Sequence, residues 1–184
     1  MADPARILVI AGSDSGGGAG IQADIKTITC LGGYAMTAVT AVTVQNTLGV
    51  SAIHPIPAAI VAAQMRACID DIGVDAVKIG MLGSAETMVA VADVLAGLRV
   101  PIVLDPVMVA KGGASLIDGE AVWALVERLL PMATVVTPNS PKLAALTETD
   151  VDDDADALLA AQELLGRGPG AVLAKGGHLP GARI

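Results

Sequence analysis

Six short apolar segments of this chain are each followed directly by glycine or by residues whose side chains can bind a ligand. These residues are Ser13 and Asp14, Gln45, Gly80 and Met81, Asp105, Asn139, and Lys175. Carboxylate and carboxamide oxygens can bind a hard cation or accept hydrogen bonds, and a lysine ammonium is a point charge suited to phosphate. One polar residue after a strand is usually ordinary loop, but six in one chain predict an active-site rim.

The first of these segments leads into a glycine-rich turn. Residues 7–11 are apolar, residues 12–20 contain five glycines, and apolar residues at helical spacing follow from Ile21 to Leu31. This order predicts a strand, a turn and a helix, in which bare backbone and free N–H groups would suit an anion or a polar heterocycle. Neither G-x-G-x-x-G nor G-x-x-x-x-G-K-[ST] is present, so the turn alone is equally well explained as a tight connection without a ligand.

Alternating strands and helices must position these residues. We expect strands at residues 7–11, 36–44, 76–79, 102–104, 134–136 and 171–174. We expect helices at residues 21–31, 57–72, 84–98 and 118–130, in a short segment after Asn139, and from an acidic cluster to Gly166. This alternation predicts an α/β fold, a mainly parallel central sheet with helices on both faces, in one domain spanning residues 1–184. The polar strand ends should then converge on one edge of the sheet.

Composition and charge argue against several classes of protein. Hydrophobic residues make up 53% of the chain and aromatic residues only 1%, so few rings are available to stack on bases. The formal net charge of −8 argues against a nucleic-acid or anionic-membrane surface, because both need a basic face. The apolar runs are too short to span a membrane, and the first residues lack a signal-peptide pattern. We therefore expect a cytoplasmic protein.

Two groups of residues have simpler explanations than chemistry. Cys30 and Cys68 are too few and too far apart for a disulfide framework or a zinc site, so both are expected to be packed thiols. The aspartates between residues 150 and 156 lack EF-hand spacing. We expect them to form a solvated helix start, where carboxylates interact favourably with the helix dipole.

Six motifs carry a resemblance to a known family. They are AGSDSGGGAGIQAD at residues 11–24, VQNT at 44–47, KIGM at 78–81, LDPVM at 104–108, TPN at 137–139 and KGGH at 175–178. With these motifs, essentially the whole chain resembles the hydroxymethylpyrimidine and phosphomethylpyrimidine kinases of thiamine biosynthesis, in the ribokinase-like superfamily. The resemblance implies a ribokinase-like fold, a homodimer, and ATP-dependent phosphorylation of 4-amino-5-hydroxymethyl-2-methylpyrimidine and then of its monophosphate.

The same resemblance implies roles for individual residues. The pyrimidine would be held by Gly12, Asp24, Thr43, Gln45, Met81 and Val107. The phosphates of ATP and a Mg²⁺ ion would be faced by Asp105, Asn139 and Lys175, with Asp105 as the metal ligand. From spacing alone, we expect Asp24 to be an exposed helix carboxylate and Met81 a core residue. A loop amide at Gln45 and a surface charge at Lys175 stand as alternatives to their implied roles.

Two features depart from the family pattern. The pattern Asn-x-x-Glu reads Asn139-Ser140-Pro141-Lys142 here, which places an ammonium where a carboxylate would help to order Mg²⁺. Lys142 could turn outward or contact a phosphate. The sequence also stops at Ile184, before the family's glycine-rich anion hole and the residue that takes the hydroxyl proton. We therefore assign no catalytic residue and expect a C-terminally incomplete chain with impaired turnover.

Two alternatives stay open. A pyridoxal or pyridoxine kinase of the same superfamily could use the same rim for another methylated six-membered ring. A non-catalytic pyrimidine-binding module would be consistent with Lys142 and with the early end of the family pattern.

Overall fold

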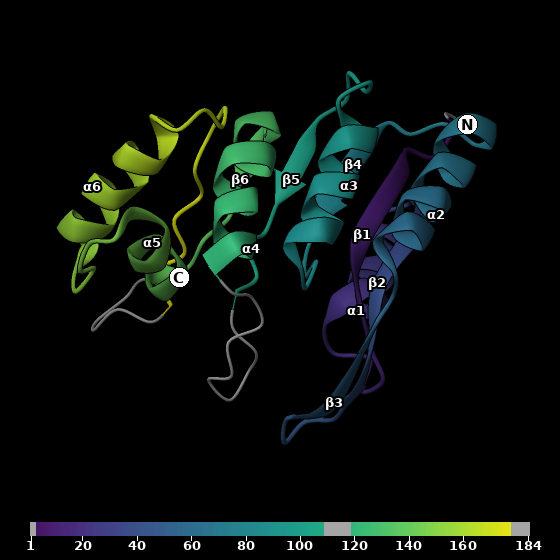
Figure 1. Ribbon diagram of the computed structural model, residues 1–184, viewed down its shortest axis with the longest axis horizontal. Helices are drawn as coiled ribbons and strands as arrows, with labels where there is room; N and C mark the ends of the chain where they lie inside the picture. The colour runs from purple at the N-terminus through teal and green to yellow at the C-terminus, as the bar shows by residue number, and fades with distance from the viewer. Residues whose placement is uncertain (1–2, 109–118, 178–184) are drawn as a thin grey trace.

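A single mostly parallel sheet organises the computed structural model, which describes residues 3–108 and 119–177 (Figure 1). Its six strands follow the order β3-β2-β1-β4-β5-β6. They are β1 (Arg6–Asp14), β2 (Tyr34–Gln45), β3 (Val50–Pro55), β4 (Ala76–Ile79), β5 (Ile102–Leu104) and β6 (Val135–Val136). Within this sheet β3 alone runs antiparallel to its neighbour. The carboxyl ends of the five other strands therefore lie at one edge, as the sequence predicts.

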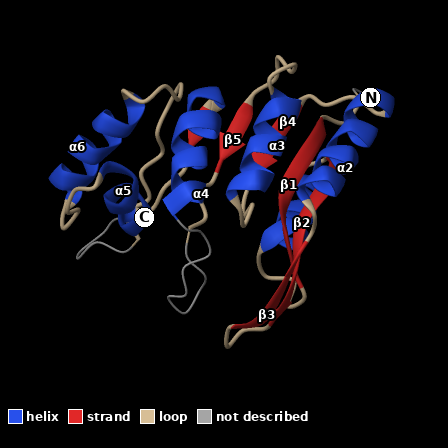
Figure 2. Cartoon of the chain, viewed as in Figure 1, coloured by secondary structure: helices blue, strands red, loops and turns tan. Residues whose placement is uncertain are grey.

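Helices cover both faces of the sheet. They are α1 (Gly20–Cys30), α2 (Ala58–Asp71), α3 (Ala85–Leu95), α4 (Gly119–Ala124), α5 (Ser140–Thr147) and α6 (Asp154–Leu165). A π-helical turn (Leu125–Leu129) and a 3₁₀ turn (Leu130–Met132) continue α4. In Figure 2, α2, α3 and α4 stand side by side in front of the strands. The predicted layered α/β architecture is confirmed.

The alternation of side chains along β1 explains how one strand supports both layers. Successive side chains of a strand point to opposite faces. Leu8 and Ile10 belong to the large core that also contains residues of α2 and α3, whereas Val9 and Ala11 pack with Ile21 of α1. All four β1 side chains are buried, as expected for one of the two middle strands of the sheet, and this burial fixes the position of the glycine-rich turn that follows β1.

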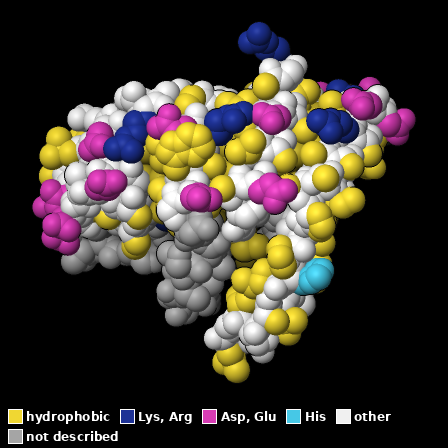
Figure 3. All heavy atoms as spheres, in the orientation of Figure 1, with side chains coloured by type: hydrophobic (Ala, Val, Ile, Leu, Met, Phe, Trp, Pro, Cys, Tyr) yellow, Lys and Arg dark blue, Asp and Glu magenta, His cyan; other side chains and the backbone are white. Residues whose placement is uncertain are grey.

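The β2–β3 hairpin was not expected from the sequence. The Asn46 side-chain oxygen accepts hydrogen bonds from the N–H groups of Leu48 (2.9 Å) and Gly49 (3.2 Å), and this tight turn reverses the chain. Figure 1 shows the hairpin projecting beyond the body of the sheet, and Figure 3 shows hydrophobic side chains gathered on it. Its exposed large apolar residues are Val42, Val44, Leu48 and Ile53. The hairpin therefore places apolar side chains beside the functional edge.

Several smaller expectations have mixed outcomes. Asp153 caps α6 by accepting hydrogen bonds from the N–H groups of Ala155 and Asp156, so the acidic cluster is a helix start as predicted. The expected strand at residues 171–174 is reduced to isolated bridges at Val172 and Lys175. Cys68 packs against the core, but Cys30 is exposed at the end of α1, so its prediction as a packed thiol was wrong.

Two further observations complete the fold. The expected first residue of the fourth helix, Asp118, lies outside the described residues. Within the described ranges, each helix is too short or too polar to cross a lipid bilayer.

Candidate functional site

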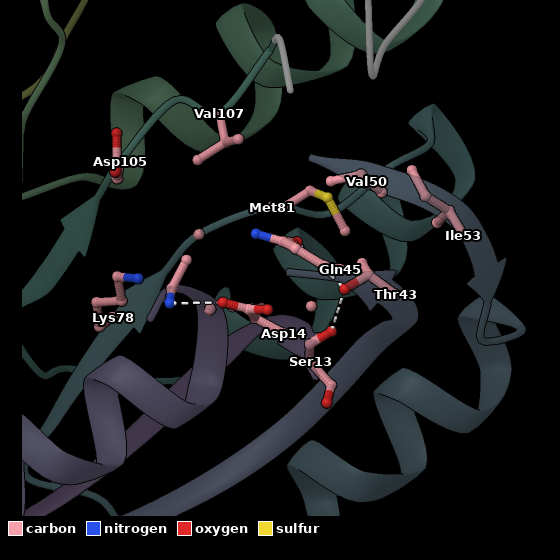
Figure 4. A pocket seen from close by; sticks show the side chains of 15 residues that line it. Ser13, Asp14, Thr43, Gln45, Val50, Ile53, Lys78, Met81, Asp105 and Val107 are labelled. Carbon is pink, nitrogen blue, oxygen red and sulfur yellow. Dashed lines mark hydrogen bonds between the residues drawn. The ribbon is translucent and has the colours of Figure 1, made fainter. Parts of the chain in front are cut away.

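A cavity of about 280 Å³ opens at the carboxyl ends of β1, β2, β4 and β5. Figure 4 shows side chains from these strand ends turned toward it, together with side chains of the β2–β3 hairpin. Its lining includes five of the six residues predicted to hold a pyrimidine, namely Gly12, Thr43, Gln45, Met81 and Val107, and it also includes Asp105. Pockets for drug-sized ligands span roughly 300–1,000 Å³, so this one suits a single small ring better than a whole nucleotide.

Asp14 organises the glycine-rich turn. Its carboxylate accepts hydrogen bonds from the N–H groups of Gly16 (2.7 Å), Gly18 (3.0 Å) and Ala19 (2.8 Å). Burial raises the pKa of Asp14, but these backbone hydrogen bonds outweigh it and hold the pKa below its ordinary value. The backbone of the turn thus surrounds the Asp14 carboxylate of the chain itself. The N–H groups of Gly16, Gly18 and Ala19, which would have suited an anionic ligand, are therefore used internally.

Any side chain larger than that of glycine at position 12 would change the shape of the cavity. A Cβ placed on Gly12 would lie 2.6 Å from the terminal methyl group of Met81. Met81 in turn is fixed to β2 through its backbone carbonyl, which accepts a hydrogen bond from the Thr40 hydroxyl (2.6 Å). The two residues therefore define one apolar wall, which explains why Met81 lines the site rather than filling the core.

Gln45 and Thr43 supply the polar part of the cavity at the end of β2. The Thr43 hydroxyl donates a hydrogen bond to the Ser13 carbonyl (2.8 Å), drawn as a dashed line in Figure 4, and lies 3.2 Å from Gln45 Oε1. The Gln45 side-chain nitrogen points into the cavity, away from Thr43 (Figure 4). A carboxamide in this position can pair with a ring edge that carries adjacent donor and acceptor atoms.

Asp24 is placed differently from the other predicted pyrimidine ligands. It lies on α1, where its carboxylate accepts a hydrogen bond from the Lys78 ammonium (2.6 Å), and it is not among the residues that line the cavity. Lys78, at β4, does line it. Asp24 can therefore act on a bound ligand through Lys78, whose position it holds.

Asp105, Asn139 and Lys175 converge beside the cavity, and Lys142 joins them. The Lys142 ammonium donates a hydrogen bond to Asp105 Oδ1 (2.5 Å), and the Lys175 ammonium lies 3.8 Å from the same oxygen. The Asn139 side-chain oxygen caps α5 by accepting a hydrogen bond from the Lys142 N–H (3.1 Å). A parallel bridge joins the backbones of Asn139 and Lys175. Two ammonium groups thus share one carboxylate at the ends of β5 and β6.

This arrangement does not fit a Mg²⁺ ion held by the protein. Mg²⁺ in kinase sites takes one or two carboxylates together with waters and substrate phosphates, and Asp105 is the single carboxylate of this cluster, already paired with Lys142. Across residues 3–108 and 119–177, no three acidic, histidine or cysteine side chains gather as a metal site. The role of Asp105 as a magnesium ligand stays a prediction, and it would require Lys142 to release the carboxylate and waters and nucleotide phosphates to supply the other ligands.

The sequence reasoning missed three residues that line the cavity. Lys78 was noted only as part of a motif, and Val50 and Ile53 belong to the unexpected strand β3. A signal for β3 was present, because Asn46 and Gly49 bracket a short turn between two β-branched segments. No comparable signal places Lys78, since its contact with Asp24 spans 54 positions of the chain.

The fold and the site together define a ribokinase-like α/β protein, with a small-molecule cavity and a charged cluster at the same sheet edge. The family model of phosphomethylpyrimidine kinase matches residues 14–184. This chain therefore belongs to the phosphomethylpyrimidine kinase family.

Individual relatives agree with this assignment. The hydroxymethylpyrimidine/phosphomethylpyrimidine kinase of Streptomyces coelicolor is 52% identical over 181 residues, covering 98% of this chain and 67% of that protein. The thiamine biosynthesis bifunctional protein ThiED of Geobacter sulfurreducens is 56% identical over 174 residues, covering 94% of this chain and 36% of that protein. The chain thus spans about two thirds of the first relative and about a third of the second.

Comparison with solved structures agrees with the family assignment. The crystal structure of phosphomethylpyrimidine kinase from Clostridium difficile superposes with a TM-score of 0.90 at 42% identity, covering 97% of this chain and 78% of that one. Pyridoxal kinase from Staphylococcus aureus in complex with AMP-PCP superposes with a TM-score of 0.87 at 34% identity, covering 97% of this chain and 66% of that one.

Proposed function

We propose that this protein binds 4-amino-5-hydroxymethyl-2-methylpyrimidine and its monophosphate, and that it serves their phosphorylation by ATP in thiamine biosynthesis. Family membership supports phosphoryl transfer as the reaction class. The Streptomyces coelicolor relative is named as a hydroxymethylpyrimidine/phosphomethylpyrimidine kinase, which supports both pyrimidines as substrates. The observation that carries the proposal is that Gln45 and Asp105 line the same cavity of about 280 Å³. One end of this cavity can recognise a ring, and the other adjoins the ammonium groups of Lys142 and Lys175.

In the proposed complex, the aminopyrimidine edge pairs with the Gln45 carboxamide. Met81 and Val107 lie against the ring faces, and the apolar side chains of Val50 and Ile53 exclude water from the hairpin side. The hydroxymethyl group then points toward Asp105. This orientation places the oxygen that receives the phosphate next to the charged cluster, where positioning and electrostatic stabilisation are what phosphoryl transfer requires.

The runner-up substrate is pyridoxal or pyridoxine. Solved pyridoxal kinases share the fold at 33–35% identity, below the 42% of the Clostridium difficile enzyme. Pyridoxal lacks the exocyclic amino group next to a ring nitrogen, so it would leave part of the Gln45 carboxamide unpaired. An unpaired buried hydrogen-bonding group costs about 1–3 kcal/mol, which favours the pyrimidine by roughly 5- to 150-fold.

The test is a comparison of ligands on one protein sample. Calorimetric binding of the hydroxymethylpyrimidine, pyridoxal and pyridoxine is measured first, followed by ADP release from ATP with each compound. We expect the pyrimidine to bind more tightly and to stimulate ADP release. A clear preference for pyridoxal would overturn the substrate assignment. Pyrimidine binding without ADP release would support a pyrimidine-binding module instead of a kinase.

A further inference from the structure

We propose that Lys142, Asp105 and Lys175 form a phosphate-binding site in which the Lys142 ammonium, rather than a divalent cation held by protein carboxylates, meets the nucleotide phosphates. This site is called the lysine clamp below. The inference rests on the proposed function in one respect, namely that the anion is the phosphate chain of ATP or ADP.

The charges of the lysine clamp favour an anion. Lys142 and Lys175 bring two positive charges to the single negative charge of Asp105, so the cluster is net positive in a chain whose formal net charge is −8. The Lys142 side chain is only 17% exposed and that of Asp105 27% exposed, so water screens this pair less than it screens a surface ion pair, whereas Lys175 is 44% exposed. An oxyanion entering there would find donors already in place.

The backbone fixes where both lysines lie. Lys142 is in the first turn of α5, and its N–H is held by the Asn139 cap. The Lys175 N–H donates a hydrogen bond to the Pro138 carbonyl (2.8 Å), so Lys175 lies against the segment that leads into the same helix. Two flexible side chains therefore start from anchored positions, which lowers the entropy lost when both contact one ligand.

The same contacts disfavour a metal ion at Asp105. A divalent cation would have to displace the 2.5 Å contact of Lys142, and two ammonium groups would then repel it. Lys142 supplies a positive charge and hydrogen-bond donors at this point without any ion. The expected consequence is nucleotide binding that depends little on divalent cations.

The experiment measures ADP binding by calorimetry in two buffers, one with EDTA and one with MgCl₂. For the unaltered protein we expect dissociation constants that agree within about threefold, because the ammonium groups are permanent parts of the site. Lys142→Glu restores the acidic residue of the family pattern. In EDTA it should weaken ADP binding at least about tenfold, since a charge-assisted hydrogen bond is replaced by repulsion, and MgCl₂ should recover most of the loss.

Arg128→Glu is the matched control. Arg128 forms an exposed ion pair with Asp93 (2.6 Å), so reversing its charge changes the net charge by the same amount and also breaks an ion pair. We expect ADP binding to change less than twofold in either buffer. Equal losses from both variants would mean that bulk charge, and not the lysine clamp, governs binding, which would overturn the inference.

Other outcomes are equally decisive. ADP binding by the unaltered protein only when MgCl₂ is present, or in neither buffer, would overturn the lysine clamp. If Lys142→Glu does not fold, Lys142→Gln removes the charge at similar length, and unchanged affinity in EDTA would again contradict us. Pyrimidine binding is measured separately. If the pyrimidine does not bind but ADP binding in EDTA still requires Lys142, the substrate assignment is wrong and the lysine clamp is supported.

Discussion

The Thr43 hydroxyl lies 3.2 Å from Gln45 Oε1 but 2.8 Å from the carbonyl oxygen of Ser13. A hydroxyl carries one proton, and the shorter contact takes most of it. Gln45 is therefore held in place by a weak contact on one side, while its side-chain nitrogen faces the cavity with no hydrogen-bond partner among residues 3–108 and 119–177. A carboxamide in this state is ready to pair with a ligand.

Replacing Gln45 should lower pyrimidine affinity without unfolding the protein. Gln45→Ala removes the carboxamide and leaves the ring edge unpaired, which should cost about 1–3 kcal/mol of binding free energy. Gln45→Glu keeps the shape but offers acceptors only, so it should lose the contact to a ring nitrogen. Calorimetric titration with the hydroxymethylpyrimidine measures both, and thermal unfolding serves as the control. Unchanged affinity in Gln45→Ala would exclude the proposed orientation.

Gly12 and Met81 give a second prediction. Gly12→Ala would place a Cβ 2.6 Å from the Met81 terminal methyl group and push that side chain into the cavity. We expect pyrimidine binding to weaken by about 1 kcal/mol, the lower end of the usual cost of overpacking, because the crowded atom is the flexible end of a side chain. Met81→Ala removes the crowded group together with its contact to the ring, so Gly12→Ala should weaken binding much less in a Met81→Ala background than in the unaltered protein. The matched control is Gly49→Ala in the hairpin turn, where an added Cβ meets no atom within 4 Å.

Asp24 and Lys78 form an ion pair (2.6 Å) between α1 and β4, and this pair predicts non-additive effects. If Asp24 acts through Lys78, then Asp24→Asn and Lys78→Met should weaken pyrimidine binding by similar amounts, and the double variant should lose little more than either one. Residues that contribute independently would show additive losses within about 0.5 kcal/mol. A double-mutant cycle by calorimetry distinguishes these cases, and additive losses would indicate that Asp24 contacts the ligand itself.

Local patterns made most of the fold predictable. The strand β5 is a short apolar run followed directly by Asp105. Ser84 caps α3 through a hydrogen bond from the Thr87 N–H, as its position before an amphipathic segment indicates. The parallel topology then follows from the alternation of strands and helices. The hairpin strand β3 was missed because the Asn46 turn was interpreted as part of a strand end rather than as a chain reversal.

The sequence could predict which residues belong to the candidate site but not which of them contact one another. Because parallel strands share one edge, Gln45 and Asp105 could be placed at the same cavity from their positions after strands. Which charged side chains form ion pairs with one another depends on packing between distant parts of the chain. Neither the contact of Lys142 with Asp105 nor that of Lys78 with Asp24 leaves a periodic signal, since the partners lie on different elements, 37 and 54 positions apart in the chain.

A last prediction concerns pH and lies far from the site. The Arg6 guanidinium donates two hydrogen bonds to the Asp75 carboxylate (2.7 and 3.0 Å), and a third comes from the Arg6 backbone N–H (2.7 Å). These contacts, led by the side-chain hydrogen bonds, lower the pKa of Asp75 to about 2. A further hydrogen bond from the Arg6 guanidinium, to the Ile72 carbonyl (2.6 Å), ties it to the end of α2.

The direction of the pH effect follows from the difference between the pKa of Asp75 in the folded and in the unfolded protein. An unfolded aspartate has a pKa of about 3.9, so the folded protein resists protonation of Asp75. The pair therefore stabilises the fold above about pH 4, and this contribution disappears as the pH falls toward 2. Asp75→Asn should lower the urea midpoint of unfolding at pH 7, and its difference from the unaltered protein should shrink between pH 4 and pH 2. Glu163→Gln breaks the Glu163–Arg167 pair, which is exposed to a similar extent, and is the matched comparison. It should have a smaller effect at pH 7, because Glu163 accepts one hydrogen bond from Arg167 whereas Asp75 accepts three from Arg6. A difference for Asp75→Asn that stays constant down to pH 2 would show that the carboxylate charge contributes nothing.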